Sequence, residues 1–290
     1  MSPSNNQAEE KWEYEYFNIT FPAEYVAHVE INRPEKLNAF IEKMWLNLSL
    51  IFNRLSHSPS VRAIVLSGAG DRAFTTGLDV KAASQGLLAS PSSGKQQEDV
   101  ARKANNLRRH ILEFQDCITA VEKCEKPVIV VYHGISYGLA VDLGCACDIR
   151  LSTTTTTFAV KEVDIGIAAD IGTLSRLPKL VSSFSFAKEI ALTARPFDSA
   201  EALQHGFVSH VLPSKAEAVA KGLQLAGLMA EKSPVAVVGT KELLNYSRDR
   251  SVEEGLRYTA IWNMSMVQSS DVGEALLGGL EKRKSVFSKL

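Results

Sequence analysis

In the first two-thirds of the chain, segments whose hydrophobic positions have the period of a strand alternate with segments that have the period of a helix. Residues 25–32 alternate apolar and polar side chains, residues 61–68 form a second strand-like run, and residues 127–132 are almost continuously apolar. Such a continuous run is typical of a strand that is covered on both faces. Helical spacing occurs over residues 40–55 and 98–124, and in the second segment apolar residues recur at alternating steps of four and three. The pattern predicts an α/β fold in which strands alternate with helices.

The last third of the chain has a mainly helical pattern. Before it, a short helix is predicted from Gly138, residues 148–152 predict a strand, and the five threonines 153–157 favour strand or edge. After residue 180 the predicted helices are residues 199–203, 216–232, 235–246, 251–267 and 271–284. Ser251-Val-Glu-Glu254 has the form of a capping box at the start of one of them. We therefore expect a cluster of helices to finish the chain.

Two segments are polar and have no period. Residues 1–11 predict a flexible N-terminus, and residues 84–97 predict a Ser-, Gly- and Gln-rich loop long enough to suggest a functional segment. The 290 residues are 45% hydrophobic and 22% charged, close to the globular average, which excludes disordered chains and coiled-coil rods. No apolar run approaches the ~20 residues that span a bilayer. We expect no membrane span.

Charge and cysteine content narrow the partners. The 32 lysines and arginines balance 33 aspartates and glutamates, so no strongly basic face is predicted and we expect no nucleic-acid partner. The four cysteines form no C-x-x-C pair, which favours a reducing interior over a disulfide framework. We also predict no metal site.

The chain ends in Ser288-Lys289-Leu290. This tripeptide is a peroxisomal address that a receptor reads at the C-terminus. It predicts the peroxisomal matrix as the compartment and a peroxisomal import receptor as a partner. The signal names a compartment and carries no information on chemistry.

One motif suggests a nucleophile. Gly134-Ile-Ser136-Tyr-Gly138 fits G-x-S-x-G between a predicted strand and a predicted helix, which is the setting of a nucleophile elbow. His205 and His210 follow in the chain order of α/β-hydrolases, but no His-Gly-Gly segment that could form an oxyanion hole precedes Ser136. A serine hydrolase that uses Ser136 stays an alternative.

Three carboxylates lie in apolar surroundings between residues 134 and 172. Asp142 follows Leu-Ala-Val, Glu162 follows Phe-Ala-Val-Lys, and Asp170 stands inside Ile-Ala-Ala-Asp-Ile-Gly. An apolar environment penalises the charged form of a carboxyl group and raises its pKa, which suits proton transfer near neutral pH. A single acid of this kind is usually a cap or an ion-pair partner. Three in one stretch favour paired acid–base chemistry.

Several motifs together resemble the crotonase (enoyl-CoA hydratase/isomerase) superfamily. They are N-R-P-E-K-L-N-A at residues 32–39, F-T-T-G-L-D at 74–79, K-P-V-I at 126–129, His133-Gly134 and D-I-R at 148–150. The resemblance runs from about residue 20 to the C-terminus. Residues 160–178 are most similar to Δ3,5-Δ2,4-dienoyl-CoA isomerases. Hydratases of the family have glutamates at the positions of Asp142 and Glu162 and a glycine at that of Asp170.

The resemblance implies the fold and its partners. It implies a crotonase-like spiral of ββα units over residues 12–198, a helical C-terminal trimerisation region over 199–287, and the targeting tripeptide at 288–290. It also implies an acyl-CoA thioester as the substrate, no separate cofactor, and a homotrimer or a dimer of trimers.

The resemblance further implies an oxyanion hole and a CoA site. Backbone N–H groups of Leu78 and Leu139 would bind the thioester oxygen, and Lys81 and Lys36 would lie near the CoA phosphates. Where many relatives read Gly-Gly-Gly, this chain reads Gly138-Leu139-Ala140. The backbone donor survives this change, and the added side chains narrow the pocket.

The implied reaction is a double-bond shift. Glu162 would take the C2 proton of a 3,5-dienoyl-CoA, Asp170 would return a proton at C6, and Asp142 would support the pair by polarising or orienting the diene. Within the family, a 2-enoyl-CoA hydratase and a Δ3-Δ2-enoyl-CoA isomerase are the alternatives. A crotonase-like scaffold without catalysis is a further one.

Overall fold

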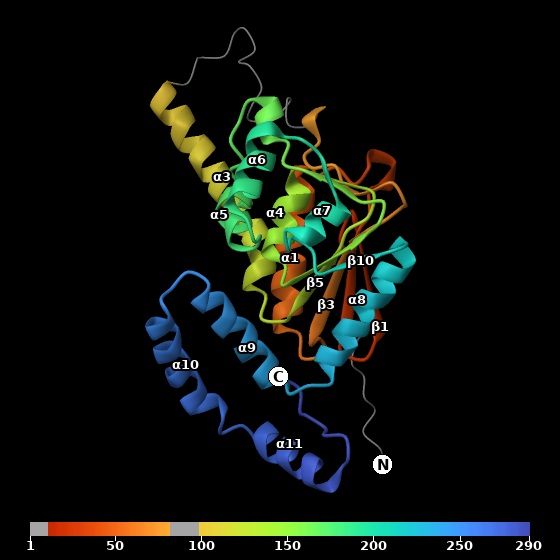
Figure 1. Ribbon diagram of the computed structural model, residues 1–290, viewed down its shortest axis with the longest axis vertical. Coiled ribbons are helices and arrows are strands. Elements are labelled where there is room, and N and C mark those ends of the chain that lie inside the picture. The colour runs from red at the N-terminus through yellow and green to blue at the C-terminus, as the bar shows by residue number, and fades with distance from the viewer. Residues whose placement is uncertain (1–10, 82–98) are drawn as a thin grey trace.

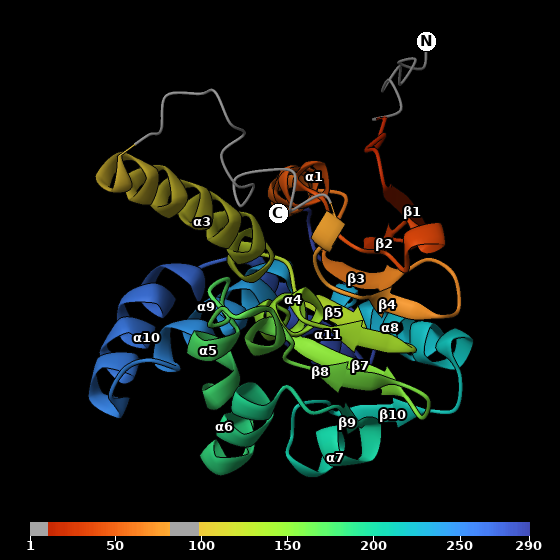
Figure 2. The same cartoon turned by 90° about the horizontal axis from the view of Figure 1, so that it is seen from above.

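Strands of two sheets alternate along the chain in the computed structural model, which describes residues 11–81 and 99–290. The six-stranded sheet has the order β1 (Phe17–Ala23), β2 (Val26–Ile31), β3 (Ala63–Gly68), β5 (Val128–Val131), β7 (Ile149–Thr153) and β10 (His210–Leu212). The four-stranded sheet has the order β4 (Ala73–Thr75), β6 (Ile135–Tyr137), β8 (Thr157–Ala159) and β9 (Phe197–Asp198). Among the strand pairs that the structure describes, β1–β2 and β8–β9 are antiparallel and the others are parallel. Figure 2 shows the two sheets from above.

The connectivity is a spiral of ββα units. Strands β3, β5 and β7 lie in the large sheet, and each is followed by a strand of the small sheet, β4, β6 or β8. The helices α3 (Val100–Lys123) and α4 (Leu139–Ala146) follow the first two of these strand pairs. The spiral that the resemblance implied is therefore confirmed.

Both faces of the central strands β3 and β5 are buried, which explains their continuous apolar runs. Ile64 and Leu66 of β3 point into the main core, whereas Ala63 and Val65 point towards helix α8 (Lys215–Ala230). Helix α8 approaches closely because Gly222 has no side chain. A Cβ there would lie 3.2–3.6 Å from side-chain atoms of Val131, Val65 and Leu151 of three neighbouring strands.

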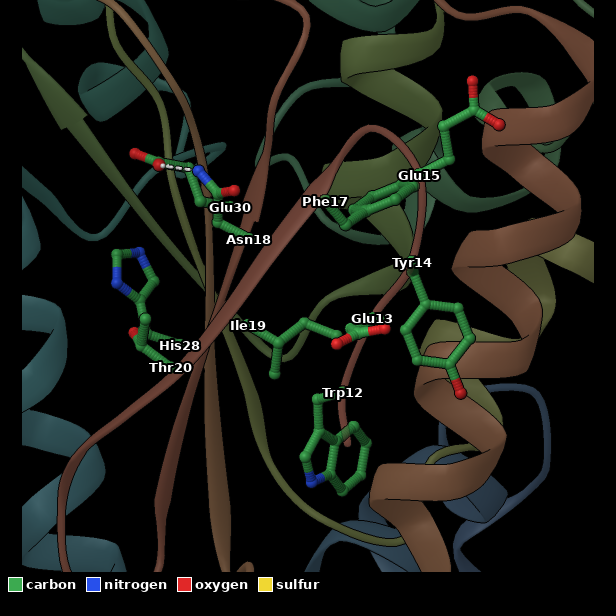
Figure 3. A pocket seen from close by; sticks show the side chains of 10 residues that line it. All are labelled: Trp12, Glu13, Tyr14, Glu15, Phe17, Asn18, Ile19, Thr20, His28 and Glu30. Atoms are coloured by element: carbon green, nitrogen blue, oxygen red, sulfur yellow. Dashed lines mark hydrogen bonds between the residues drawn. The ribbon is translucent and has the colours of Figure 1, made fainter. Parts of the chain in front are cut away.

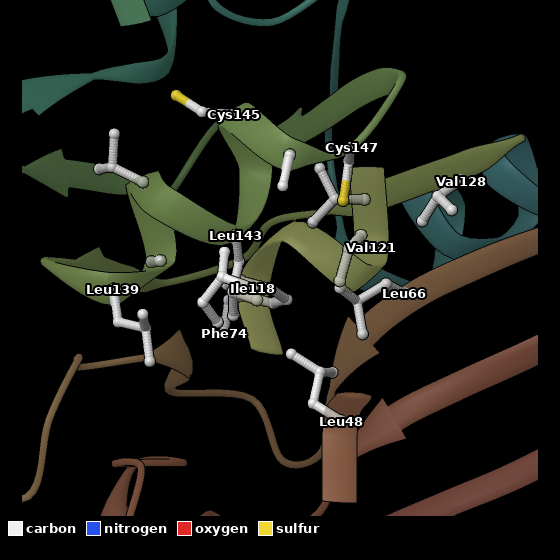
Figure 4. Packing of buried hydrophobic residues seen from close by; sticks show 14 of the residues in the cluster. Leu48, Leu66, Phe74, Ile118, Val121, Val128, Leu139, Leu143, Cys145 and Cys147 are labelled. Carbon is white, nitrogen blue, oxygen red and sulfur yellow. The ribbon is translucent and has the colours of Figure 1, made fainter. Parts of the chain in front are cut away.

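The main core surrounds α4, every residue of which is buried. Leu48 of α1 (Glu42–His57) and Ile118 and Val121 of α3 pack around it, as Figure 4 shows. Because α4 has no solvated face, the carboxylate of Asp142 in its first turn is carried into the protein interior. The predicted helices at 40–55, 98–124 and from Gly138 are confirmed with shifts of a few residues.

The chain after residue 180 is mainly helical, as predicted, but it also contains two short strands that were not predicted. Besides α6 (Phe184–Thr193) and α7 (Ser199–Gln204) it contains β9 and β10, which have two and three residues and are too short to leave a period-two pattern. Since β10 and α8 belong to the large sheet and its cover, the predicted boundary after residue 198 falls inside the core.

Three helices form a group beside the core, to which α9 (Pro234–Ser247) is joined by the buried Lys241 and its ion pair with Asp148 at 2.7 Å. Figure 1 shows α9, α10 (Val252–Met266) and α11 (Ser270–Glu281) as a group, with the C-terminus returning towards the core. The capping box predicted at Ser251 and Glu254 is confirmed at the start of α10. No described helix is both long and apolar enough to cross a membrane.

Other local predictions have mixed outcomes. Of the five threonines, Thr153 ends β7 and Thr157 begins β8, and a turn joins them. The predictions for residues 1–11 and 84–97 lie outside the described residues, except for Lys11.

Candidate active site

Asp142 is the most buried of the three candidate carboxylates. It lies in the first turn of α4 and is 1% exposed. Its Oδ1 accepts two hydrogen bonds of 2.7 Å, from the backbone N–H and from the hydroxyl of Thr173. Burial raises the pKa of Asp142 to about 6, and the two bonds from Thr173 oppose that rise because they favour the charged form.

Glu162 begins the short 3₁₀ helix η2 (Glu162–Ile165) and is half-buried. Its Oε2 is buried and has no hydrogen-bond partner among the described residues. Burial, and next the negative charge of Asp142, raise the pKa of Glu162 to about 7. An unpaired carboxylate with this pKa can take a proton from a weak carbon acid at neutral pH.

Asp170 is more exposed than we predicted from the apolar residues that flank it in the sequence. Residues 167, 168 and 170 are exposed, whereas Ala169 and Ile171 are buried, because the segment runs along the surface before helix α5 (Thr173–Arg176). Partial burial of the carboxyl still raises the pKa of Asp170, while His110 on α3 lowers it. The Gln115 amide of α3 donates to the backbone oxygen of Asp170 at 2.5 Å, which fixes the segment on that helix.

Two loops bring the predicted oxyanion donors together. Gly77 has φ +92°, and a Cβ on it would lie 3.1 Å from Tyr137 O and 3.5 Å from Leu139 N. The loop that carries Leu78 therefore contacts the start of α4 directly. A Cβ on Gly138 would lie 3.5 Å from Glu162 Oε1, so the Glu162 carboxylate lies beside the same helix start.

Both donor N–H groups are left unused by the described backbone. Phe40 N–H donates to Gly77 O at 2.8 Å, and Asp79 N–H donates to Phe40 O at 2.9 Å. These two bonds form the β-bridge between Phe40 and Leu78, and neither of them uses the N–H of Leu78. Leu139 is the first residue of α4, where N–H groups have no intrahelical acceptor. The positive end of the helix dipole adds to the attraction for an anion there.

The motif at residues 32–39 supports the Gly77 loop. Asn38 is fully buried, and its amide donates to Ala69 O at 2.9 Å and to Ala73 O at 3.0 Å. The Thr75 hydroxyl donates to Asn38 O at 2.7 Å. These bonds hold the strand that leads into Gly77, which gives the motif a structural role.

The predicted CoA lysines are exposed on connected segments. Lys36 ends the 3₁₀ helix η1 (Pro34–Lys36), and Lys81 lies three residues beyond Leu78. The Arg33 guanidinium joins the two segments, since it contacts the Asp79 carboxylate at 2.9 Å and donates to Ala39 O at 2.7 Å. The Arg33–Asp79 pair was not predicted from the sequence, because its members are 46 residues apart in the chain.

The structure contradicts the serine-hydrolase alternative. Ser136 lies inside β6 and is fully buried, and its Oγ has no hydrogen-bond partner among the described residues. His205 stacks on Phe186 at 3.9 Å between ring centroids, and His210 lies exposed on β10. A serine nucleophile needs a base within hydrogen-bond reach, and neither histidine supplies one.

A hollow of about 730 Å³ lies away from these carboxylates. Figure 3 shows it along the outer strands β1 and β2 and the segment before them. Its lining residues are Trp12, Glu13, Tyr14, Glu15, Phe17, Asn18, Ile19, Thr20, His28 and Glu30. It contains none of the candidate catalytic or oxyanion residues and does not change the location of the site.

Comparisons with known proteins cover nearly the whole chain. A sequence model of the family described as enoyl-CoA hydratase/isomerase matches residues 23–289. The chain is 45% identical over 280 residues to the mitochondrial Delta(3,5)-Delta(2,4)-dienoyl-CoA isomerase of Rattus norvegicus, covering 96% of this chain and 84% of the relative. It is 44% identical over 265 residues to the peroxisomal Delta(3,5)-Delta(2,4)-dienoyl-CoA isomerase of Arabidopsis thaliana, covering 91% and 93%. A solved structure of a putative enoyl-CoA hydratase from Streptomyces coelicolor A3(2) has TM-score 0.84 and 27% identity over 99% of both chains.

Proposed function

The chain belongs to the enoyl-CoA hydratase/isomerase family, the crotonase superfamily, and we propose that it is a Δ3,5-Δ2,4-dienoyl-CoA isomerase. The observation that carries the proposal is the unpaired Glu162 carboxylate beside two unused backbone N–H groups, with Asp142 and Asp170 on either side of it in the chain. The names of relatives at 44–45% identity support the same activity.

Glu162 is the base in this proposal. It takes the proton from C2 of a 3,5-dienoyl-CoA, and the electron pair of that C–H bond moves into the conjugated chain. The thioester oxygen gains negative charge and is bound by the N–H groups of Leu78 and Leu139. One donor of this kind is worth ~3–4 kcal/mol in the transition state.

Asp170 is the acid. The dienolate carries charge as far as C6, and a protonated Asp170 delivers a proton there, which leaves double bonds at C2 and C4. The raised pKa of Asp170 favours the protonated form that this step needs. The position of Asp170, eight residues beyond Glu162 in an extended surface segment, lets the two carboxyls serve different ends of the diene.

Asp142 has a supporting role. Its negative charge is one cause of the raised pKa of Glu162, which makes Glu162 a stronger base. The thioester itself accepts the electrons, so the reaction requires no added cofactor. Lys36 and Lys81 bind the CoA phosphates in this proposal, as exposed cations on two joined segments.

We also propose a homotrimer, or a dimer of trimers, built through the C-terminal helices. Large apolar side chains of α10 and α11 are exposed in the single chain: Val252, Leu256, Ile261, Met264, Leu276 and Leu280 are 52–83% exposed. Apolar surface of this extent on adjacent helices is typical of a protein interface.

The proposed compartment is the peroxisomal matrix. Ser288, Lys289 and Leu290 are exposed, so an import receptor can reach the tripeptide. The Arabidopsis relative is named peroxisomal and the rat relative mitochondrial.

Incubation of the pure protein with a 3,5-dienoyl-CoA and, separately, with a 2-enoyl-CoA tests the activity. We expect conversion of the dienoyl-CoA to the 2,4-isomer and little hydration of the enoyl-CoA. Consumption of the 2-enoyl-CoA alone would make the protein a hydratase and remove Asp170 as the acid.

A further inference from the structure

Asp142 depends on a residue that the proposed reaction does not use directly. Thr173 begins α5 and is fully buried, and both its N–H and its hydroxyl donate to the same carboxylate oxygen, Asp142 Oδ1, at 2.7 Å. Two charge-assisted bonds to one oxygen fix the rotamer of the carboxylate and favour its ionised form.

The backbone that presents Thr173 is itself held by Arg176. Gly172 has φ +150°, a conformation suited to glycine, and a Cβ on it would collide with Arg176 Nη1. The Arg176 side chain therefore lies directly against the residue that precedes Thr173. Its charge also favours the ionised form of Asp142 and so lowers the pKa of that carboxyl.

Arg176 is fixed from the opposite side by α3. Its Nε and Nη2 donate to Glu122 Oε2 at 3.1 and 2.8 Å, and its Nη2 donates to Thr119 Oγ1 at 2.9 Å. Arg248, which follows α9, contacts the other oxygen of Glu122 at 2.6 Å. The side chains of Arg176 and Glu122 are only 12% and 15% exposed, so this is a partly buried network.

We propose that Thr173 and Arg176 are positioning residues that hold the Asp142 carboxylate ionised and in one orientation beside Glu162. This proposal rests on the proposed function for its kinetic consequence. Its structural part, the support of an ionised Asp142, stands on the contacts alone. The active form of the site is then the one in which Asp142 and Glu162 are both ionised.

The groups that face the pair come from several elements. They are Arg176 on α5, Asp170 in the preceding segment, Tyr132 directly after β5, Cys145 on α4, and Glu122 on α3. Arg176 is the cation among them that favours ionised Asp142, and Asp170 opposes it. Loss of the Thr173 hydroxyl removes one donor to the charged form without adding a charge. The pair then takes up its first proton at higher pH.

The test is Thr173→Val, which keeps the shape of the side chain and removes the hydroxyl, with Thr173→Ser as the matched control. In the pH profile of kcat for a 3,5-dienoyl-CoA, we expect the acid limb of the valine variant to move up by about 0.1–0.3 pH unit, because Glu162, with the higher pKa, takes most of the first proton of the pair. The serine variant should have the same acid limb in its pH profile of kcat as the wild-type protein. When Asp142 is already replaced by asparagine, Thr173→Val should not move the acid limb further.

Thermal unfolding gives a readout that needs no substrate. A hydroxyl donates more strongly to a carboxylate than to a neutral carboxyl group. The Tm gap between the serine and valine variants should therefore widen by about 2–4 °C from pH 4 to pH 8. A purely structural threonine gives a gap that is the same at both pH values and a limb that does not move, and this result overturns the proposal.

The two readouts also separate this proposal from the proposed function. A widening Tm gap in a protein that does not isomerise 3,5-dienoyl-CoA would reject the function and keep the Thr173–Asp142 link. Arg176→Met, with Arg176→Lys as the charge-retaining control, should move the limb in the same direction as Thr173→Val. Arg248 still pairs with Glu122 in that variant, which helps the fold survive the change. If only Thr173→Val moves the limb, Arg176 has no positioning role.

Discussion

Replacement of Glu162 by glutamine should abolish turnover and, in the same variant, stabilise the fold at alkaline pH. Glutamine keeps the size of the side chain and cannot ionise. The pKa of Glu162 is raised from 4.5 to about 7 in the folded protein. The folded state therefore binds the proton more tightly than the unfolded state, and the wild-type chain loses stability as the pH rises from 4.5 through 7.

The magnitude follows from the same two pKa values. A pKa rise from 4.5 to about 7 corresponds to about 3 kcal/mol at 1.36 kcal/mol per unit. Because Glu162 is coupled to Asp142 and partly solvated, we expect about 2 kcal/mol at pH 8 and none below pH 4, where both states are protonated. Loss of the base should lower kcat by about 10²–10⁴-fold.

The assay is denaturant unfolding at pH 4 and pH 8, together with turnover of a 3,5-dienoyl-CoA. Asp164→Asn is the matched control, because Asp164 lies on the same 3₁₀ helix and forms an exposed pair with Lys161 at 2.8 Å. Exposed pairs contribute little, so this variant should change stability by less than about 1 kcal/mol. Equal stabilisation of Glu162→Gln at both pH values, or retained turnover, would refute the reasoning.

Four further outcomes test other parts of the structure. Asp170→Asn should stop isomerisation and leave exchange of the C2 proton in D2O intact; loss of both would give Asp170 a different role. Gly144→Ala should destabilise the fold by about 2–3 kcal/mol in denaturant unfolding, because the added methyl collides with the Tyr132 hydroxyl in the core. Deletion of residues 288–290 should leave kcat unchanged and move an N-terminally labelled protein from peroxisomes to the cytosol; peroxisomal retention would disprove the signal. Ser251→Ala should cost about 1 kcal/mol, since it removes the hydroxyl that accepts from the Glu254 N–H and leaves only the backbone N–H bond of the capping box, and an unchanged unfolding midpoint would count against it.

The parts of the fold that the sequence predicted are those with strong local periods. Residues 61–68 and 127–132 read as strands because they are buried on both faces. Residues 98–124 read as a helix because their apolar side is regular over many turns. Strand β10 was not predicted, since three residues leave no period and its place in the sheet is set by pairing with β7, about 60 residues earlier in the chain.

The candidate site divides in a similar way. The carboxylates Asp142, Glu162 and Asp170 could be found because charged groups in apolar sequence are rare and the surrounding motifs resemble a family. The partner of Asp142 could not be found, because Thr173 lies 31 residues away and meets it only in the folded chain. The solvent exposure of Asp170 was also not predicted, since apolar neighbours in sequence do not cover it in space.

The most direct test of the central claim is the position at which solvent hydrogen enters the product. We propose to convert a 3,5-dienoyl-CoA in D2O and locate the deuterium by NMR. Removal of the C2 proton by Glu162 and delivery at C6 by Asp170 predict one deuterium at C6 of the 2,4-dienoyl-CoA. Deuterium at C4 with a 2,5-dienoyl product, or a hydrated product, would contradict the account.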